Sequence, residues 1–345
     1  MYTKYVPILK WKAGEKSCLE NLSSTAINSI IPFIEVSTPS DSDKEETAEK
    51  KMNKLLTSFN SCWEEKPFYF HLTNDWYENI DDISQISNIY ESLYHRINHP
   101  NAIPAFDISD EINISNLSNL GDTNGVCLYI TISNFEQLSD ILNAYIMNSW
   151  IIPENTDLLI DLKYIDNETY PLRAALTTVL SDITNISSYR RIIISSCSFP
   201  KNLSKLQSNI VNEFPRLELS IHHICQKLQK TFSFNYIYSD YGPANLNDSG
   251  FVIGMIPNFK IKYSTVDKYL VVKGLSIKRG GLELPNVSPC CKLLMTHPSY
   301  SGEDFSYGDK IIYSTANGTN PKPGNLTNWV CYSFNHHIEL IVSSL

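Results

Sequence analysis

Eight apolar runs recur along the first 242 residues of the chain. Each run is nearly continuous in apolar residues rather than strictly alternating, which is typical of strands buried on both faces of a parallel sheet. Their spacing of about thirty residues is the length that a strand, a helix and two loops require. The runs predict strands at residues 5–10, 30–36, 68–72, 102–108, 125–132, 157–162, 190–196 and 234–242.

Helix-favouring sequence follows most of these runs. A charged helix is expected to open at Ser40 and Asp41 and to continue through Phe59, with acidic residues early and lysines late. After the fourth run Ser and Asn crowd residues 113–119, so the pattern does not define a helix there. Eight strand-and-helix units predict a closed, TIM-like (β/α)8 barrel of the α/β class over residues 1–242, rather than an open doubly wound sheet.

The last part of the chain, residues 243–345, has a different texture. Gly and Pro become frequent, and β-prone pieces occur at 259–263, 269–272, 310–313, 328–332 and 337–342, with a helix expected around 290–295. We expect a mixed α+β C-terminal extension that packs on the barrel and belongs to the same structural unit. The pattern does not say whether it covers the mouth or the bottom of the barrel.

Composition narrows the function classes. The chain of 345 residues has a net charge of -9, so bulk electrostatics disfavour nucleic acid as a partner. No apolar stretch approaches the roughly 20 residues needed to cross a membrane, and residues 1–10 lack a signal-peptide core, so a cytoplasmic protein without membrane contact is expected. The eight cysteines are scattered without a Cys-x-x-Cys pair and are interpreted as small buried hydrophobes.

Working residues of such barrels sit at the C-terminal ends of the strands and in the loops that follow. A ring of carboxylates and lysines at these positions favours a polar or phosphate-bearing ligand. The polar residues expected there are Lys10, Lys12, Glu35, His71, Asp107, Thr131, Asp161, Lys163, Ser195, Ser196, Asp240 and Tyr241.

Three of these carboxylates, Glu35, Asp107 and Asp161, lie within or at the end of apolar runs, where an isolated charge is costly to bury. They should therefore be paired, protonated or functional. General acid-base catalysis and binding of a divalent metal are the functional alternatives. A structural ion-pair network with the nearby lysines is the other alternative.

The segment Asp240-Tyr241-Gly242 is open to two interpretations. A tight turn explains Gly242 and the Asp240 side chain, whereas a site role also explains a tyrosine at a barrel mouth. In the extension, His336 and His337 are adjacent. On the strand expected there they would face opposite ways, so at most one could reach a given pocket, and a structural histidine is the alternative.

Several motifs together resemble the "beta protein" family of phages and bacteria, which is often found among mobile and defence-associated genes. The resemblance implies a barrel-like fold and an extension that belong to one protein, and it implies no settled reaction. Lys273 stands where relatives tend to have Arg, which puts a planar, bidentate role for that side chain in doubt. The motifs lie at residues 5–15, 31–35, 198–200, 239–242, 261–263, 273–274, 305–309, 324–325, 329 and 335–337.

Two functional hypotheses follow. The first is an anti-phage enzyme, a hydrolase or phosphodiesterase, with Asp240, Asp161 and Glu35 as acid-base groups or metal ligands. The second is a non-catalytic sensor or scaffold that recognises a phage protein or a partner subunit. No cofactor is evident, and a divalent metal is an open alternative. The residues expected to contact the ligand are Lys10, Lys12, Glu15, Asp107, Tyr241, Tyr263, Lys273, Ser306, Asp309, Asn325, His336 and His337.

Overall fold

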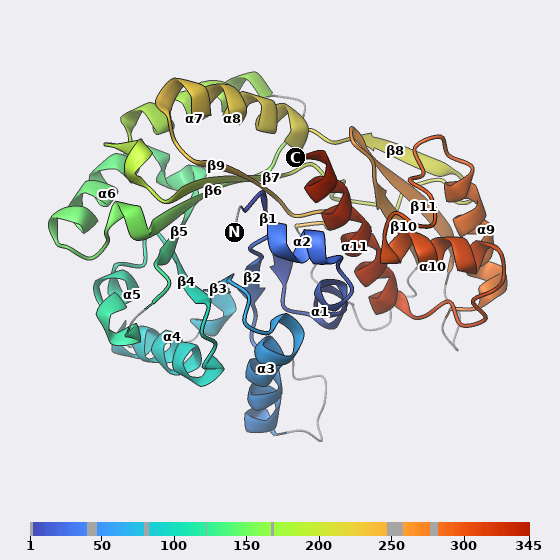
Figure 1. Cartoon of the computed structure of the whole chain (residues 1–345), viewed down its shortest axis with the longest axis horizontal. Helices are drawn as coiled ribbons and strands as arrows, with labels where there is room; N and C mark the ends of the chain where they lie inside the picture. The colour runs from blue at the N-terminus through green and yellow to red at the C-terminus, as the bar shows by residue number, and fades with distance from the viewer. Residues whose placement is uncertain are drawn as a thin grey trace.

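A computed structural model describes residues 3–39, 47–78, 83–121, 123–166, 169–246, 258–276 and 282–345. Eight parallel strands form a closed barrel, in which the first strand pairs with both the second and the last (Figure 1). The predicted barrel is confirmed. Its strands are β1 (Tyr5–Lys10), β2 (Phe33–Val36), β3 (Phe68–Leu72), β4 (Ala102–Asp107), β5 (Val126–Thr131), β6 (Thr156–Tyr164), β7 (Arg191–Cys197) and β9 (Tyr236–Asp240).

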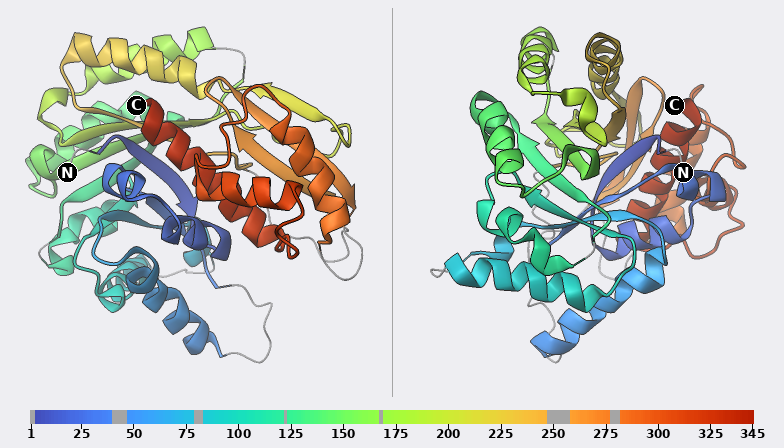
Figure 2. Two further views of the ribbon diagram at one scale, coloured as in Figure 1. Left: turned by 45° about the vertical axis from the view of Figure 1, so that its right-hand side comes forward. Right: turned by 60° about the vertical axis from the view of Figure 1, so that its left-hand side comes forward.

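Helices between the strands form the outer ring of the barrel (Figures 1 and 2). They are α1 (Ala13–Glu20), α2 (Ser24–Ser29), α3 (Ala48–Trp63), α4 (Ile83–Ile97), α5 (Glu111–Ser115), α6 (Leu138–Met147), α7 (Thr169–Asp182) and α8 (Glu218–Phe232). The helix start predicted at Ser40 and Asp41 lies outside the described residues. Where Ser and Asn crowd the sequence, the helix after β4 is a short α5 followed by a 3-10 turn, Leu117–Leu120.

Side chains of the barrel strands alternate between two apolar layers. One layer fills the barrel interior and includes Ile8, Phe33 and Tyr129, while the other packs against the outer helices. The N-terminal end of the barrel is closed by a buried carboxylate, Asp157, which pairs with Arg190 at 2.5 Å and with Arg191 at 3.0 Å. The polar residues at the opposite end remain available to form a site.

The extension combines an antiparallel three-stranded sheet with three helices, as a mixed α+β unit. The sheet has the order β10 (Asn258–Ser264), β11 (Lys268–Ser276), β8 (Val211–Pro215), and the helices are α9 (Leu284–Met295), α10 (Tyr307–Ala316) and α11 (Leu326–Ser344). Strand β8 comes from the segment between β7 and α8, before the boundary expected at Gly242. The barrel part of the sequence therefore contributes an edge strand to the sheet of the extension.

The strands predicted at 310–313, 328–332 and 337–342 are wrong, because these residues belong to α10 and α11. Helix α11 lies between the barrel and the extension sheet and contacts α1, β1 and β10 (Figures 1 and 2). It is buried on almost all sides, so its sequence lacks the polar face that marks most helices. Gly14 permits its close approach to α1, since a Cβ atom there would lie 2.8 Å from Val330.

Candidate functional site

A cavity of about 1010 Å³ opens at the C-terminal end of the barrel. Its barrel wall includes Lys10 at the end of β1, Glu35 on β2 and Tyr241 directly after β9. The extension supplies Lys262 from β10 and Phe334 from α11. The extension therefore walls the mouth of the barrel, and we call this space the mouth cavity.

Among the residues that the structure describes, five lysines line the mouth cavity, against two glutamates, Glu15 and Glu35. The lysines come from separate places in the fold: two from the β1 end, one from β6, one from the loop after β7 and one from β10. Such a concentration of positive charge, in a chain whose net charge is -9, attracts anions to this cavity. The lysines are Lys10, Lys12, Lys163, Lys201 and Lys262.

Lys163 is held in place by its own backbone and by a buried carboxylate. Its φ of 55° is in the left-handed region, at an irregularity in the pairing of β6 with β7. Asp161 fixes this conformation, because its Oδ1 atom accepts the Lys163 backbone N–H at 2.8 Å. The Lys163 ammonium lies 3.0 Å from Oδ2 of the same carboxylate, and the lysine side chain is 47% exposed.

Two tyrosines complete the surroundings of Asp161. The hydroxyl of Tyr129 donates to Oδ2 at 2.6 Å, and the hydroxyl of Tyr241 donates to the same atom. The Lys163 Nζ atom lies 5.0 Å from the ring centroid of Tyr129 and 5.7 Å from that of Tyr241, within cation–π range. Both oxygens of Asp161 are occupied, so this predicted catalytic residue is placed to position Lys163.

Glu35 lines the mouth cavity and is directly opposite Lys10 on the neighbouring strand. Burial raises the pKa of Glu35, while the charges of Lys163 and Lys10 oppose the rise. Burial likewise raises the pKa of Glu15, against its own backbone N–H and the charge of Lys12. A carboxyl group whose pKa is raised keeps its proton to a higher pH than a free one, which suits acid-base chemistry.

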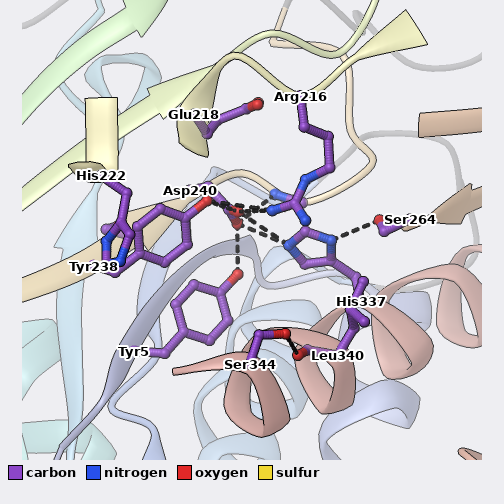
Figure 3. Close-up of polar contacts among 12 residues, drawn as sticks. Tyr5, Arg216, Glu218, His222, Tyr238, Asp240, Ser264, His337, Leu340 and Ser344 are labelled. Atoms are coloured by element: carbon purple, nitrogen blue, oxygen red, sulfur yellow. Dashed lines mark hydrogen bonds and ion pairs between the residues drawn. The ribbon is translucent and has the colours of Figure 1, made fainter. Parts of the chain in front are cut away.

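Asp240 points away from the mouth cavity. Successive residues of a strand face opposite ways, so Tyr241 joins the apolar cluster of the barrel interior. Asp240 instead faces His337 of α11 (Figure 3). The carboxylate accepts hydrogen bonds from the hydroxyls of Tyr5 at 2.5 Å and Tyr238 at 2.7 Å, and from the backbone N–H of Gly242 at 2.9 Å. Asp240 is fully buried and does not line the cavity.

Two basic side chains complete the environment of Asp240, although burial lowers the pKa of His337. His337 Nε2 lies 3.0 Å from Oδ1, and the buried guanidinium of Arg216 lies 3.5 Å from Oδ2 (Figure 3). Burial alone would raise the pKa of Asp240, but His337, Arg216 and the Tyr5 hydroxyl together hold it well below its usual range. The carboxylate is therefore an ionised member of the contact between barrel and extension.

Ser264, His337 and Asp240 form a hydrogen-bonded chain with the composition of a hydrolase triad. The Ser264 hydroxyl lies 2.7 Å from Nδ1 of His337, whose Nε2 atom faces Asp240 (Figure 3). All three residues have no exposed surface. A triad serine must reach the substrate, so these three hydrogen-bonded residues anchor α11 rather than attack a ligand.

The second histidine, His336, anchors α11 to a different buried carboxylate. His336 Nδ1 lies 2.7 Å from Asp309, and its ring stacks on Tyr263 at 3.8 Å between centroids. Asp309 also accepts from the hydroxyls of Tyr263 and Ser306. The expectation that the two histidines face opposite ways on a strand is wrong, because both lie on a helix and each meets a buried carboxylate.

The remaining predicted ligand residues lie apart from the mouth cavity. Lys273 donates to the backbone carbonyls of Ser204 and Leu206, and Asn325 caps the N-terminus of α11. Asp107 lines a separate hollow of about 500 Å³ beside His71, where its Oδ1 accepts from the backbone of Ser109 at 3.0 Å.

The structure brings six of the predicted residues together in the mouth cavity: Lys10, Lys12, Glu15, Glu35, Lys163 and Tyr241. Sequence reasoning did not assign Lys201 or Lys262 to the site, because one follows β7 in an irregular loop and the other belongs to the extension sheet. Lys163 is recognisable from its place at the end of β6. Within the described ranges, no group of three or more His, Cys, Asp or Glu side chains is placed to hold a metal ion.

In the part of the chain that the structure describes, no helix has the length and apolar content needed to cross a membrane. A comparison with curated proteins finds no match. A family profile described as Beta protein matches residues 5–343, which includes the barrel, the extension and every residue of the mouth cavity. This chain therefore belongs to the Beta protein family.

Proposed function

We propose that the mouth cavity binds a phosphate-bearing ligand and that the protein hydrolyses a phosphoester or phosphodiester bond there. The observation that supports this proposal is the convergence of five lysines from separate elements on one cavity. Lysine ammonium groups are common phosphate partners, and their charge stabilises the negative charge that develops on a phosphoryl group. Chains of the same fold commonly place their reactive groups at this end of the barrel.

Glu35 is the acid-base group in this proposal. Its ionised form would remove a proton from a water molecule whose oxygen forms the new bond to phosphorus. The bond from phosphorus to the leaving oxygen breaks, and that oxygen takes up a proton from the solvent. Burial raises the pKa of Glu35, which makes its ionised form a stronger base, while the charges of Lys163 and Lys10 oppose the rise.

Binding is tested by calorimetry with inorganic pyrophosphate as the probe. Lys12→Ala is expected to weaken binding by about tenfold, since it removes one exposed lysine from the cavity wall. Lys227→Ala is the matched control, because Lys227 is an exposed lysine on α8 that does not line the cavity. Equal losses in the two variants, or no binding by the unaltered protein, would contradict the proposed site.

Hydrolysis is tested with Glu35→Gln, which keeps the shape of the side chain and removes its proton-accepting oxygen. Turnover of a phosphodiester substrate should fall by about 100-fold or more, while pyrophosphate affinity changes little. Binding without turnover in the unaltered protein would favour the alternative of a non-catalytic sensor. The defence setting implied by the family resemblance is tested by infecting cells that carry each variant with phage.

A further inference from the structure

The mouth cavity is much larger than a phosphate ion requires. At about 1010 Å³ it lies at the upper end of the range for sites that enclose organic ligands of drug size, roughly 300–1,000 Å³. Part of its wall is apolar, with Ile8, Leu246, Val330 and Phe334 among the lining residues. An inorganic anion would leave this wall in contact with water, so the ligand should carry an organic part as well as charge.

The lysines are distributed around the cavity rather than gathered at one point. Lys10 and Lys12 are at the end of β1, whereas Lys163 is at the end of β6, which is separated from β1 in the barrel by β7 and β9. Lys262 reaches the cavity from the extension sheet. One phosphate group is too small to contact lysines on several walls, so the distribution suits a ligand with at least two phosphate groups.

An aromatic ring lies beneath one of these lysines, which covers one face of the ring. Tyr164, the last residue of β6, lines the cavity, and the ammonium of Lys201 is 3.8 Å from the centroid of its ring. The pair places a planar aromatic surface next to a phosphate-binding charge. A nucleotide has the same arrangement, because its base and its phosphates are joined through one sugar, and tyrosine rings stack on bases of any sequence.

We propose that the ligand of the mouth cavity is a nucleotide with at least two phosphate groups, whose phosphates contact the lysines and whose base stacks on the face of the Tyr164 ring opposite Lys201. This inference rests on the function proposed above and names the substrate class of the same site. Tyr164 is then a specificity-determining residue, since it distinguishes a nucleoside diphosphate from pyrophosphate of similar charge.

Calorimetric titrations with ADP, GDP, CDP and UDP, each compared with inorganic pyrophosphate, test the inference. At least one nucleotide should bind about tenfold more tightly than pyrophosphate, which is the size of one aromatic stacking contact on a base. Tyr164→Ala should abolish this preference and leave pyrophosphate affinity within about twofold. Tyr164→Phe should keep the preference, because the ring is retained. This variant shows whether a loss seen in Tyr164→Ala comes from the missing ring or from misfolding.

Tyr170→Ala is the matched control, since Tyr170 is an 82% exposed tyrosine on α7 outside the cavity. Its nucleotide preference should equal that of the unaltered protein. If pyrophosphate binds as tightly as every nucleotide, or if Tyr164→Ala keeps the preference, the nucleotide assignment is overturned while the anion site stands. If neither pyrophosphate nor any nucleotide binds, the proposed function fails together with this inference.

Discussion

Replacing Asp240 by asparagine separates a structural role of this residue from a catalytic one. The substitution keeps the size of the side chain and removes its charge. Arg216 then loses its counterion while its side chain is only 1% exposed, and an amide NH2 group is forced to face donors such as the Tyr5 hydroxyl. The perturbation therefore falls on the contact between the barrel and the extension.

The expected cost follows from the burial of the pair. Removing one partner of a buried ion pair typically costs about 3–5 kcal/mol, because the other charge is left without compensation. With an unfolding entropy of about 2.1 cal/mol/K per residue over 345 residues, this loss corresponds to a fall in Tm of about 4–7 °C if the chain unfolds as one unit. Such a loss is a large part of the stability of a typical domain.

The free energy of unfolding is measured by urea denaturation, and pyrophosphate binding is measured on the same samples. Asp240→Asn should lower stability by the amount above and leave the affinity within about twofold, since Asp240 faces away from the mouth cavity. Asp304→Asn provides the control, because Asp304 is an exposed carboxylate in the loop before α10. A variant of unchanged stability that loses ligand binding or turnover would refute this reasoning and restore the catalytic role.

Three further predictions concern other parts of the molecule. Gly308→Ala should lower the free energy of unfolding by about 3 kcal/mol in urea denaturation, because its Cβ atom would lie 2.3 Å from the carbonyl oxygen of Tyr332; an unchanged midpoint would contradict this close contact. Burial lowers the pKa of His222 to about 4. Below about pH 6.5 the unfolded chain therefore binds a proton that the folded chain does not. The free energy of unfolding should fall toward pH 4 by up to about 1.4 kcal/mol per pH unit. Urea midpoints at pH 7, 6 and 5 should therefore decline less steeply for His222→Gln than for the unaltered protein, and parallel declines would disprove it. His336→Phe should lower the free energy of unfolding by about 3 kcal/mol, because the buried Asp309 loses its imidazole partner and keeps only the hydroxyls of Tyr263 and Ser306. Pyrophosphate affinity should not change, and its loss in a stable variant would place His336 in the site.

The barrel was predictable because its physical cause is local. A strand buried on both faces must be apolar at nearly every position, so each strand of the barrel can be recognised in the sequence as an apolar run. The position of Lys10, Lys12 and Glu35 in the mouth cavity follows from the same reasoning, since each lies at or just beyond a strand end. Lys262 was not predictable in this way, because its approach depends on how the extension packs.

Asp240 and Tyr241 show how far strand ends alone can mislead. Both residues lie at the end of β9, but the alternation of side chains sends Tyr241 into the barrel and Asp240 toward α11. The two-residue period of a strand, applied to this pair, is enough to place the two side chains on opposite faces. Helix α11 was mistaken for strands, because a helix buried on almost all sides has no polar stripe by which to recognise it. Its aromatic residues also favour a strand in a sequence-based prediction.

The anchoring of α11 also constrains how the protein is made. Strand β9 closes the barrel, yet the histidine that partners Asp240 is supplied by a helix that begins roughly 85 residues later in the chain. At a synthesis rate of about 5–20 residues per second, His337 is added to the chain several seconds after Asp240. The barrel and the extension should therefore complete folding together. A nascent chain that stalls before Leu326 should expose Asp240 and Arg216, without α11 to cover them, to chaperones and proteases.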